Sequence, residues 1–236
     1  MDTAAYQIQG RTVGMPAMVR DASSGTALYL VPTAAAQGLI PGKAFEIVEV
    51  TPGQAQMVLG FVDYRDNDLG DYDEVMIVFF VRPAGAPNAT EGTFIYKLPV
   101  NQSFTCEAGC KIWGFPKSVE EIDVTYEPER VSCRLVMGGR HVFTLTLPRL
   151  AGDGAADVDM EMTTYTYLDG PTSLSFSQGG ATAVNPGGAG VEIRLGDHPL
   201  ADELRSLGLP DTPPILSTWN EKMRGSFGAP HRLELP

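Results

Sequence analysis

The chain has 236 residues, of which 43% are apolar and 19% charged, a mixture typical of folded rather than disordered proteins. Its 17 basic and 29 acidic residues give a net charge of −12. That charge repels nucleic-acid phosphates and anionic membrane surfaces, so we expect neither as a partner. We expect one domain that spans residues 1–236.

The N-terminal residues and the cysteines predict a cellular location. Residues 1–18 contain no basic segment followed by an apolar run, so we expect no signal peptide. No apolar stretch approaches the ~20 residues of a membrane span. The three cysteines, Cys106, Cys110 and Cys133, are odd in number, which favours reduced thiols and a cytoplasmic protein. With only three histidines beside them, we predict no metal site.

Strand patterns dominate the chain. β-branched and aromatic runs bounded by Gly, Pro or Asp predict strands over Thr26–Pro32, Ala44–Val50, Ala55–Tyr64 and Glu74–Pro83. Alternating arms predict two later hairpins, one within Val131–Pro148 around Gly138 and Gly139, and one within Thr163–Gln178. The Gly-rich segment Ala183–Ile193 predicts a long hairpin loop.

Helical patterns are few and short. We expect helices within Pro32–Pro41, capped by Thr33, and from Asn101 or Gln102 to about Cys110. A third helix, within Gly196–Pro210, would be capped by Asp197. Together the elements predict an α+β protein that is mostly antiparallel β.

Lys117 follows the apolar turn Trp113–Pro116 in the stretch "CKIWGFPKSVEEIDV". A free lysine amine has a pKa near ~10.4 and is protonated at neutral pH, whereas desolvation lowers the pKa of a buried amine. From composition alone, the commoner interpretation is a surface lysine whose stem lies on an aromatic ring while its charge stays in water. The alternative is a reactive amine.

The segment "EAGCKIWGFPKSVEEIDV" (Glu107–Val124) resembles the Schiff-base motif of the acetoacetate decarboxylase family, in which a Gly-rich helix end leads to Pro-Lys. The resemblance extends from about Met15 to Pro230. The other segments that are similar to the family, in the same order, are Met15–Pro32, Leu69–Val81, Leu195–Pro210 and Ser217–Pro230.

The resemblance implies a cone-like β barrel with a few short helices, assembled as a homo-oligomer and needing no cofactor. It implies that Lys117 condenses with a ketone, and acetoacetate decarboxylase is itself the standard example of a lysine activated in this way. It also implies that Glu74 is catalytic and that Arg20 binds the substrate carboxylate. Without the resemblance, Arg20 would be a surface ion pair and Glu74 a solvated acid.

The sequence also departs from the family. Ser118 stands where well-known members carry a second lysine, so desolvation by Trp113 and Phe115 must do more to activate the amine. We expect these three residues in the substrate pocket. A second family glutamate aligns near Leu59. Asp63, on the same strand face, is a candidate substitute, although a solvated acid at a strand end is the commoner interpretation.

The leading hypothesis is a lyase that decarboxylates a small 3-keto acid through an iminium on Lys117. One alternative is an aldolase-dehydratase that acts on pyruvate-like 2-keto acids through the same lysine. Another is a barrel that binds a small molecule without catalysis. In each enzymatic hypothesis the partner is a small keto acid.

Overall fold

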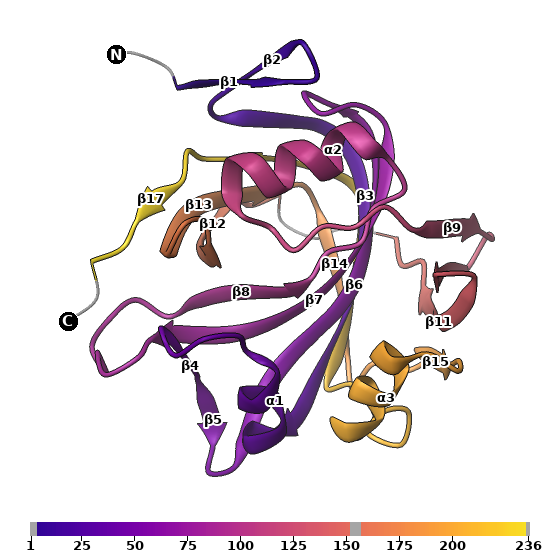
Figure 1. Cartoon of the computed structure of the whole chain (residues 1–236). Coiled ribbons are helices and arrows are strands. Elements are labelled where there is room, and N and C mark those ends of the chain that lie inside the picture. Colours follow the sequence, from indigo (N-terminus) through magenta and orange to yellow (C-terminus); the bar gives the residue numbers. More distant parts are fainter. Residues whose placement is uncertain (1–3, 152–156, 235–236) are drawn as a thin grey trace.

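The computed structural model describes residues 4–151 and 157–234. Seven strands close a barrel, and all pair antiparallel except the parallel pair β8–β12 (Figure 1). In ring order they are β16 (Leu216–Phe227), β3 (Ala17–Pro32), β6 (Gln54–Asn67), β7 (Tyr72–Pro83), β8 (Gly92–Lys97), β12 (Met160–Tyr167) and β13 (Pro171–Gly179), which pairs again with β16.

Short strands extend the edges of the barrel sheet. They are β4 (Phe45–Ile47) on β7, β5 (Glu49–Thr51) on β6, β14 (Thr182–Pro186) on β16 and β17 (His231–Arg232) on β13. A separate hairpin joins β1 (Ala5–Ile8) to β2 (Arg11–Gly14). The mostly antiparallel barrel with short helices confirms the fold class predicted from the sequence.

A second sheet packs on the outside of the barrel. Its strands, in spatial order, are β15 (Glu192–Leu195), β11 (Arg140–Pro148), β10 (Arg130–Met137) and β9 (Glu121–Tyr126). One continuous hydrophobic cluster joins the two sheets, with Leu59 and Phe79 from the barrel and Phe143 and Leu145 from the outer sheet. Strands of the barrel wall are therefore covered on both faces, which explains why β6 and β7 are apolar runs without simple alternation.

The helices are α1 (Thr33–Leu39), α2 (Ser103–Ala108), the π-helical turn η1 (Gly109–Trp113) and α3 (Pro199–Ser206). Figure 1 shows α2 lying across one end of the barrel, next to the β1–β2 hairpin. A second hydrophobic cluster fixes it there and includes Ile8, Phe104 and Trp113. None of the helices in the described ranges has the length and apolar character needed to cross a bilayer.

Several predicted boundaries need correction. The cap of α1 is Pro32, and Thr33 is already helical. The cap of α3 is His198, whose Nδ1 accepts the Leu200 N–H, and not Asp197. The Gly-rich segment is not a hairpin loop, because β14 pairs with β16 whereas β15 pairs with β11.

Candidate active site

The turn that carries Lys117 is built by two glycine-dependent steps. Gly114 closes η1 with φ +69°, and a Cβ there would clash with the carbonyl oxygen of Tyr167. The Phe115 N–H then donates to the Gly109 carbonyl at 3.1 Å, and the Lys117 N–H donates to the Phe115 carbonyl at 2.8 Å. The chain is thereby folded back across the end of its own helix, with Lys117 at the start of an extended segment.

That extended segment is joined to β7 through Val100. The Val100 N–H donates to the Ser118 carbonyl at 2.9 Å, and Val100 forms a second bridge with Glu74 on β7. The Val75 N–H donates to the Pro99 carbonyl at 3.0 Å. Backbone pairing thus places Lys117 beside Glu74, although 43 positions separate them.

Lys117 and Glu74 form a buried ion pair. Lys117 Nζ lies 2.7 Å from Glu74 Oε2, and the two side chains are only 2% and 7% exposed. Nζ also donates to Thr105 Oγ1 at 3.2 Å and lies 5.0 Å from the centre of the Tyr72 ring. A buried pair of this kind needs such extra contacts, because two charges taken out of water are costly unless hydrogen bonds satisfy them.

Two stacked tyrosines support the carboxylate. Tyr64 donates its O–H to Glu74 Oε1 at 3.4 Å, and its ring stacks on Tyr72 with centroids 4.6 Å apart. Burial raises the pKa of both tyrosines well above the usual range, and the charge of Glu74 adds to the effect. Both phenols therefore stay protonated at neutral pH and can donate hydrogen bonds.

The stem of Lys117 occupies space that a side chain at position 109 would fill. A Cβ on Gly109 would lie 2.6 Å from Lys117 Cδ and 2.7 Å from Cε. Gly109 has φ −59°, so its backbone does not itself require glycine. The absence of a side chain at Gly109 leaves the space that the Lys117 stem occupies.

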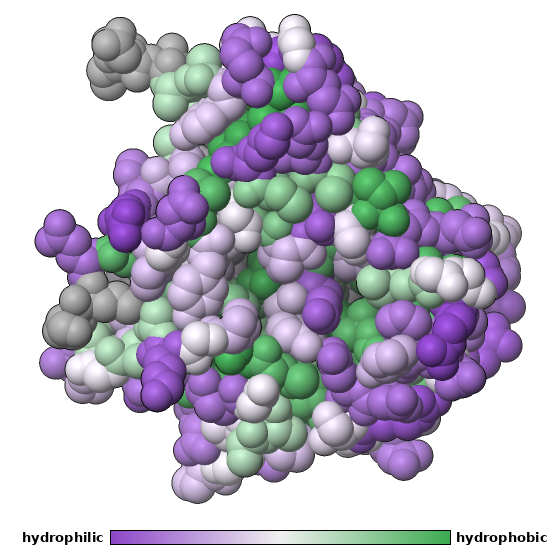
Figure 2. All heavy atoms as spheres, in the orientation of Figure 1, coloured by the Kyte–Doolittle hydropathy of each residue, from purple (hydrophilic) through white to green (hydrophobic). Residues whose placement is uncertain are grey.

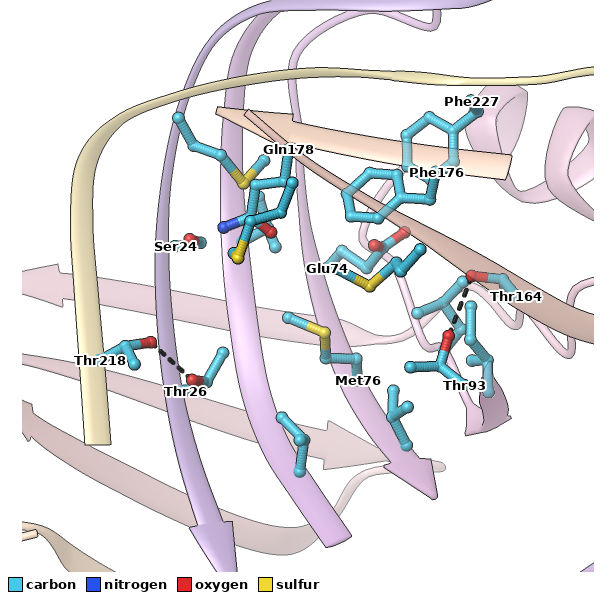
Figure 3. Close-up of a pocket in the computed structure, with 18 of the residues that line it drawn as sticks. Ser24, Thr26, Glu74, Met76, Thr93, Thr164, Phe176, Gln178, Thr218 and Phe227 are labelled. Atoms are coloured by element: carbon cyan, nitrogen blue, oxygen red, sulfur yellow. Dashed lines mark hydrogen bonds between the residues drawn. The ribbon is translucent and has the colours of Figure 1, made fainter. Parts of the chain in front are cut away.

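A cavity of about 300 Å³ lies inside the barrel, and Glu74 is part of its lining. Figure 3 shows side chains from several strands pointing into it, among them Met76, Phe176 and Phe227. The face seen in Figure 2 is hollowed near its middle, with apolar residues visible inside a largely hydrophilic rim. Lys117 is not among the described lining residues. Its amine contacts Glu74, and Glu74 lines the cavity.

The predicted pocket residues are only partly brought together. Phe115 lines the cavity. Trp113 lies behind it, 1% exposed, stacked on Phe115 with centroids 5.6 Å apart and donating its indole N–H to the Gly228 carbonyl at 2.8 Å. Ser118 lies outside the lining in the described part of the chain, and its backbone carbonyl holds Val100.

Arg20 lies away from this cluster. Its guanidinium is 48% exposed and forms ion pairs with Asp66 at 2.8 Å and Asp68 at 2.7 Å. Among the described residues it does not line the cavity. The substitute acid Asp63 is also elsewhere, because it accepts the Tyr126 O–H at 2.6 Å and pairs with Arg65.

The sequence interpretation missed four residues of this site. Thr105 contacts the amine, Tyr64 and Tyr72 support Glu74, and Gly109 makes room for the lysine. Tyr72 had a signal, because it precedes Glu74 by two positions and so shares its strand face. Within 4–151 and 157–234, no three Asp, Glu, Cys or His side chains gather as metal ligands would.

Comparison with known proteins places the chain in a family. A family model for acetoacetate decarboxylase (ADC) matches residues 6–209. The chain therefore belongs to the acetoacetate decarboxylase family, as the resemblance of the Lys117 segment suggested. A search of curated proteins found no match.

Solved structures share the fold. The acetoacetate decarboxylase of Legionella pneumophila is 17% identical with a TM-score of 0.63, and the match covers 93% of this chain and 87% of that one. The enduracididine biosynthesis enzyme MppR is 15% identical with a TM-score of 0.60, covering 93% and 88%. An acetoacetate decarboxylase-like enzyme from Sphingomonas wittichii RW1 is 16% identical with a TM-score of 0.55, covering 95% and 96%.

Proposed function

We propose that the protein is a lyase that forms a Schiff base between Lys117 and a 3-keto acid and then decarboxylates it. The observation that carries the proposal is the buried pair of Lys117 and Glu74 beside the barrel cavity. Membership of the acetoacetate decarboxylase family supports a lyase-type enzyme that acts on small keto acids.

The first chemical step uses both members of the pair. A protonated amine has no free electron pair, so Lys117 must lose a proton before it can attack a carbonyl carbon, and Glu74 is the adjacent acceptor at 2.7 Å. The amine adds to the ketone to give a carbinolamine. Glu74 then returns a proton to the hydroxyl, which leaves as water, and an iminium remains on Lys117.

The second step follows from the charge of the iminium. The electron pair of the bond to the carboxylate moves into the C=N⁺ group, which releases CO₂ and leaves a neutral enamine. A positive and a negative charge disappear together, and an apolar cavity favours such a change because it solvates the two charges poorly. A proton that comes from solvent water is added to the enamine carbon, which gives an iminium again. Hydrolysis of this iminium by water then releases the ketone and the lysine amine.

An aldolase-dehydratase that acts on pyruvate-like 2-keto acids is the second candidate. Two observations favour it: Ser118 replaces the second lysine, and Arg20 lies on the surface. MppR, which shares the fold at 15% identity, has been solved with pyruvate and with a condensation product of pyruvate and imidazole 4-carboxaldehyde. The third candidate is a non-catalytic binder.

Borohydride trapping separates the three. The protein is incubated with acetoacetate or pyruvate, reduced, and measured by intact mass, with Lys117→Ala as control and with CO₂ release followed in parallel. The decarboxylase proposal expects an acetoacetate adduct on Lys117 and CO₂ release. A pyruvate adduct without CO₂ from acetoacetate would favour the aldolase-dehydratase, and no adduct with either acid would leave only the binder.

Three further expectations remain proposals: a single domain over residues 1–236, a homo-oligomer and a cytoplasmic location. Light scattering of the purified protein would measure the number of subunits. A monomer at micromolar concentration would contradict the homo-oligomer.

A further inference from the structure

The cavity extends far beyond the reacting pair. Along β7 the side chains of Glu74, Met76, Val78 and Phe80 all line it, because alternate residues of a strand share a face. Six residue steps at ~3.3 Å each span about 20 Å. The reacting carbonyl and carboxylate of a four-carbon keto acid would occupy only the end of this length beside Glu74.

Much of the cavity has a flexible apolar lining. Met76, Met160, Met162 and Met223 line it from three different strands or their ends. Thioether side chains adapt to irregular apolar partners. Gly60 is paired with Met76 in the barrel sheet and has no side chain, so it leaves space beside Met76.

Most of the hydroxyl groups in the lining already have partners. The Thr26 and Thr218 hydroxyls are hydrogen-bonded to each other at 2.6 Å, and those of Thr93 and Thr164 at 3.0 Å, as the dashed lines in Figure 3 show. A polar substrate group placed there would find few unsatisfied partners, so it would lose hydrogen bonds to water without replacing them.

The charge of the lining excludes a second anionic group. None of the described lining residues is Lys, Arg or His, and Glu74 is their one carboxylate. A keto diacid or a phosphorylated keto acid would therefore bring an anion into an apolar space without a counter-ion, which costs several kcal/mol. The end of the substrate remote from the carbonyl must be uncharged.

We propose that the substrate is a keto acid with an apolar tail, alkyl or aryl, which lies along Met76 and Val78 towards Phe80. The assignment rests on the proposed Schiff-base function for the carbonyl end and on the cavity alone for the tail. The two parts are separable by experiment.

The tail is tested without imine chemistry. Binding of propanone, heptan-2-one and 4-phenylbutan-2-one is measured by calorimetry with Lys117→Met, whose fold is first verified by circular dichroism, because this variant has no amine to condense with them. Each buried methylene should strengthen binding by about four-fold, so heptan-2-one should bind at least about ten-fold more tightly than propanone. The tighter of heptan-2-one and 4-phenylbutan-2-one identifies the tail as a chain or a ring. Equal dissociation constants for propanone and both long ketones would overturn the tail assignment.

The reacting end and the tail are tested together in the unsubstituted protein. Borohydride trapping compares acetoacetate with 3-oxooctanoate, and the half-saturating concentration of the longer acid should be at least about ten-fold lower. In Val78→Trp the indole fills the far part of the cavity, so the ratio of the two concentrations should fall towards one. Val50→Trp, at an exposed strand position, is the matched control and should keep the ratio.

The outcomes distinguish the two claims. If the long ketones bind Lys117→Met tightly but neither acid gives an adduct, the Schiff-base function fails and the apolar tail site stands. If both acids give adducts with equal half-saturating concentrations and the ketones bind equally, the Schiff base stands and the substrate class is wrong.

Discussion

At the scale of single residues, Lys117 and Glu74 depend on each other. Removing one member of a buried ion pair leaves the other charged and unpaired, which usually destabilises a protein by about 3–5 kcal/mol. The pair is 2.7 Å apart and almost fully enclosed, so the proton transfer proposed for it and its contribution to stability cannot be changed independently. Conservative substitutions are therefore the informative ones.

Glu74→Gln keeps the shape of the side chain but removes the proton acceptor. We expect CO₂ release to fall by about 10²–10⁴-fold, the usual contribution of a general acid or base. Steady-state assays at neutral pH measure this, with circular dichroism to verify the fold. Glu121→Gln, at an exposed position of β9, is the control. A rate within three-fold of the unsubstituted protein would remove Glu74 from the mechanism.

Asp73, next to Glu74 on β7, should make stability depend on pH. Burial, with help from Asp63, raises the pKa of Asp73 to about 6 in the folded protein, above its ordinary value near 4. The folded state therefore binds this proton more tightly than the unfolded state, so the stability it contributes is present below about pH 4 and lost as the pH rises to about 6.

The variant Asp73→Asn cannot ionise. In urea unfolding at pH 4 and pH 7, the free energy of unfolding of the variant should rise relative to that of the unsubstituted protein as the pH increases. Asp71→Asn, at a neighbouring exposed position, should show a smaller change. A difference between Asp73→Asn and the unsubstituted protein that does not vary with pH would contradict the shifted pKa of Asp73.

At the scale of elements, the junction of α2 and η1 shapes the site. Gly109→Ala adds only a methyl group, and its backbone conformation suits alanine. The new Cβ would lie 2.6 Å from Lys117 Cδ, so the lysine stem must shift, and we expect its amine to lose the 2.7 Å contact with Glu74. We expect the yield of trapped adduct to fall at least ten-fold while the far-ultraviolet circular dichroism stays unchanged.

Gly38→Ala in α1 is the matched control. A Cβ there would meet nothing within 4 Å, and alanine favours the helix, so this variant should trap normally and be stabilised by up to about 1 kcal/mol. Normal trapping by Gly109→Ala would show that the lysine has another path to the cavity.

The elements also show what the sequence could and could not predict. The hairpin Val131–Pro148 was predicted correctly because its signal is local, two alternating arms around Gly138 and Gly139. The first half of β3 was missed, because "MVRDASSG" has no strand pattern and is held by neighbouring strands on both sides. Likewise, pairing through Val100 brings Lys117 beside Glu74, and no local pattern encodes such a contact. Arg20 was placed from a resemblance, and its two aspartate partners lie far along the chain.

At the scale of the whole molecule, the outer sheet is packed tightly onto the barrel. A Cβ on Gly25 of β3 would lie 2.6 Å from Leu147 Cδ1 of β11, so the two sheets are close at that point. Phe143 is fully buried between them. Phe143→Ala should lower the free energy of unfolding by about 3–5 kcal/mol in urea titrations. A loss below 1 kcal/mol would indicate that the outer sheet contributes little to stability.

The parallel pairing of β8 with β12 closes the barrel through only two register pairs, Thr93 with Thr164 and Phe94 with Tyr165. By contrast, β6 and β7 share eight. This pairing thus has the fewest register pairs in the ring, so we expect it to open first, and both of its threonines line the cavity. Amides of β8 should exchange with deuterium sooner than those of β6. A bulky ketone bound in the cavity should slow the exchange of the β8 amides. Such transient opening would give an apolar tail a route into the barrel interior without unfolding the end that holds the lysine.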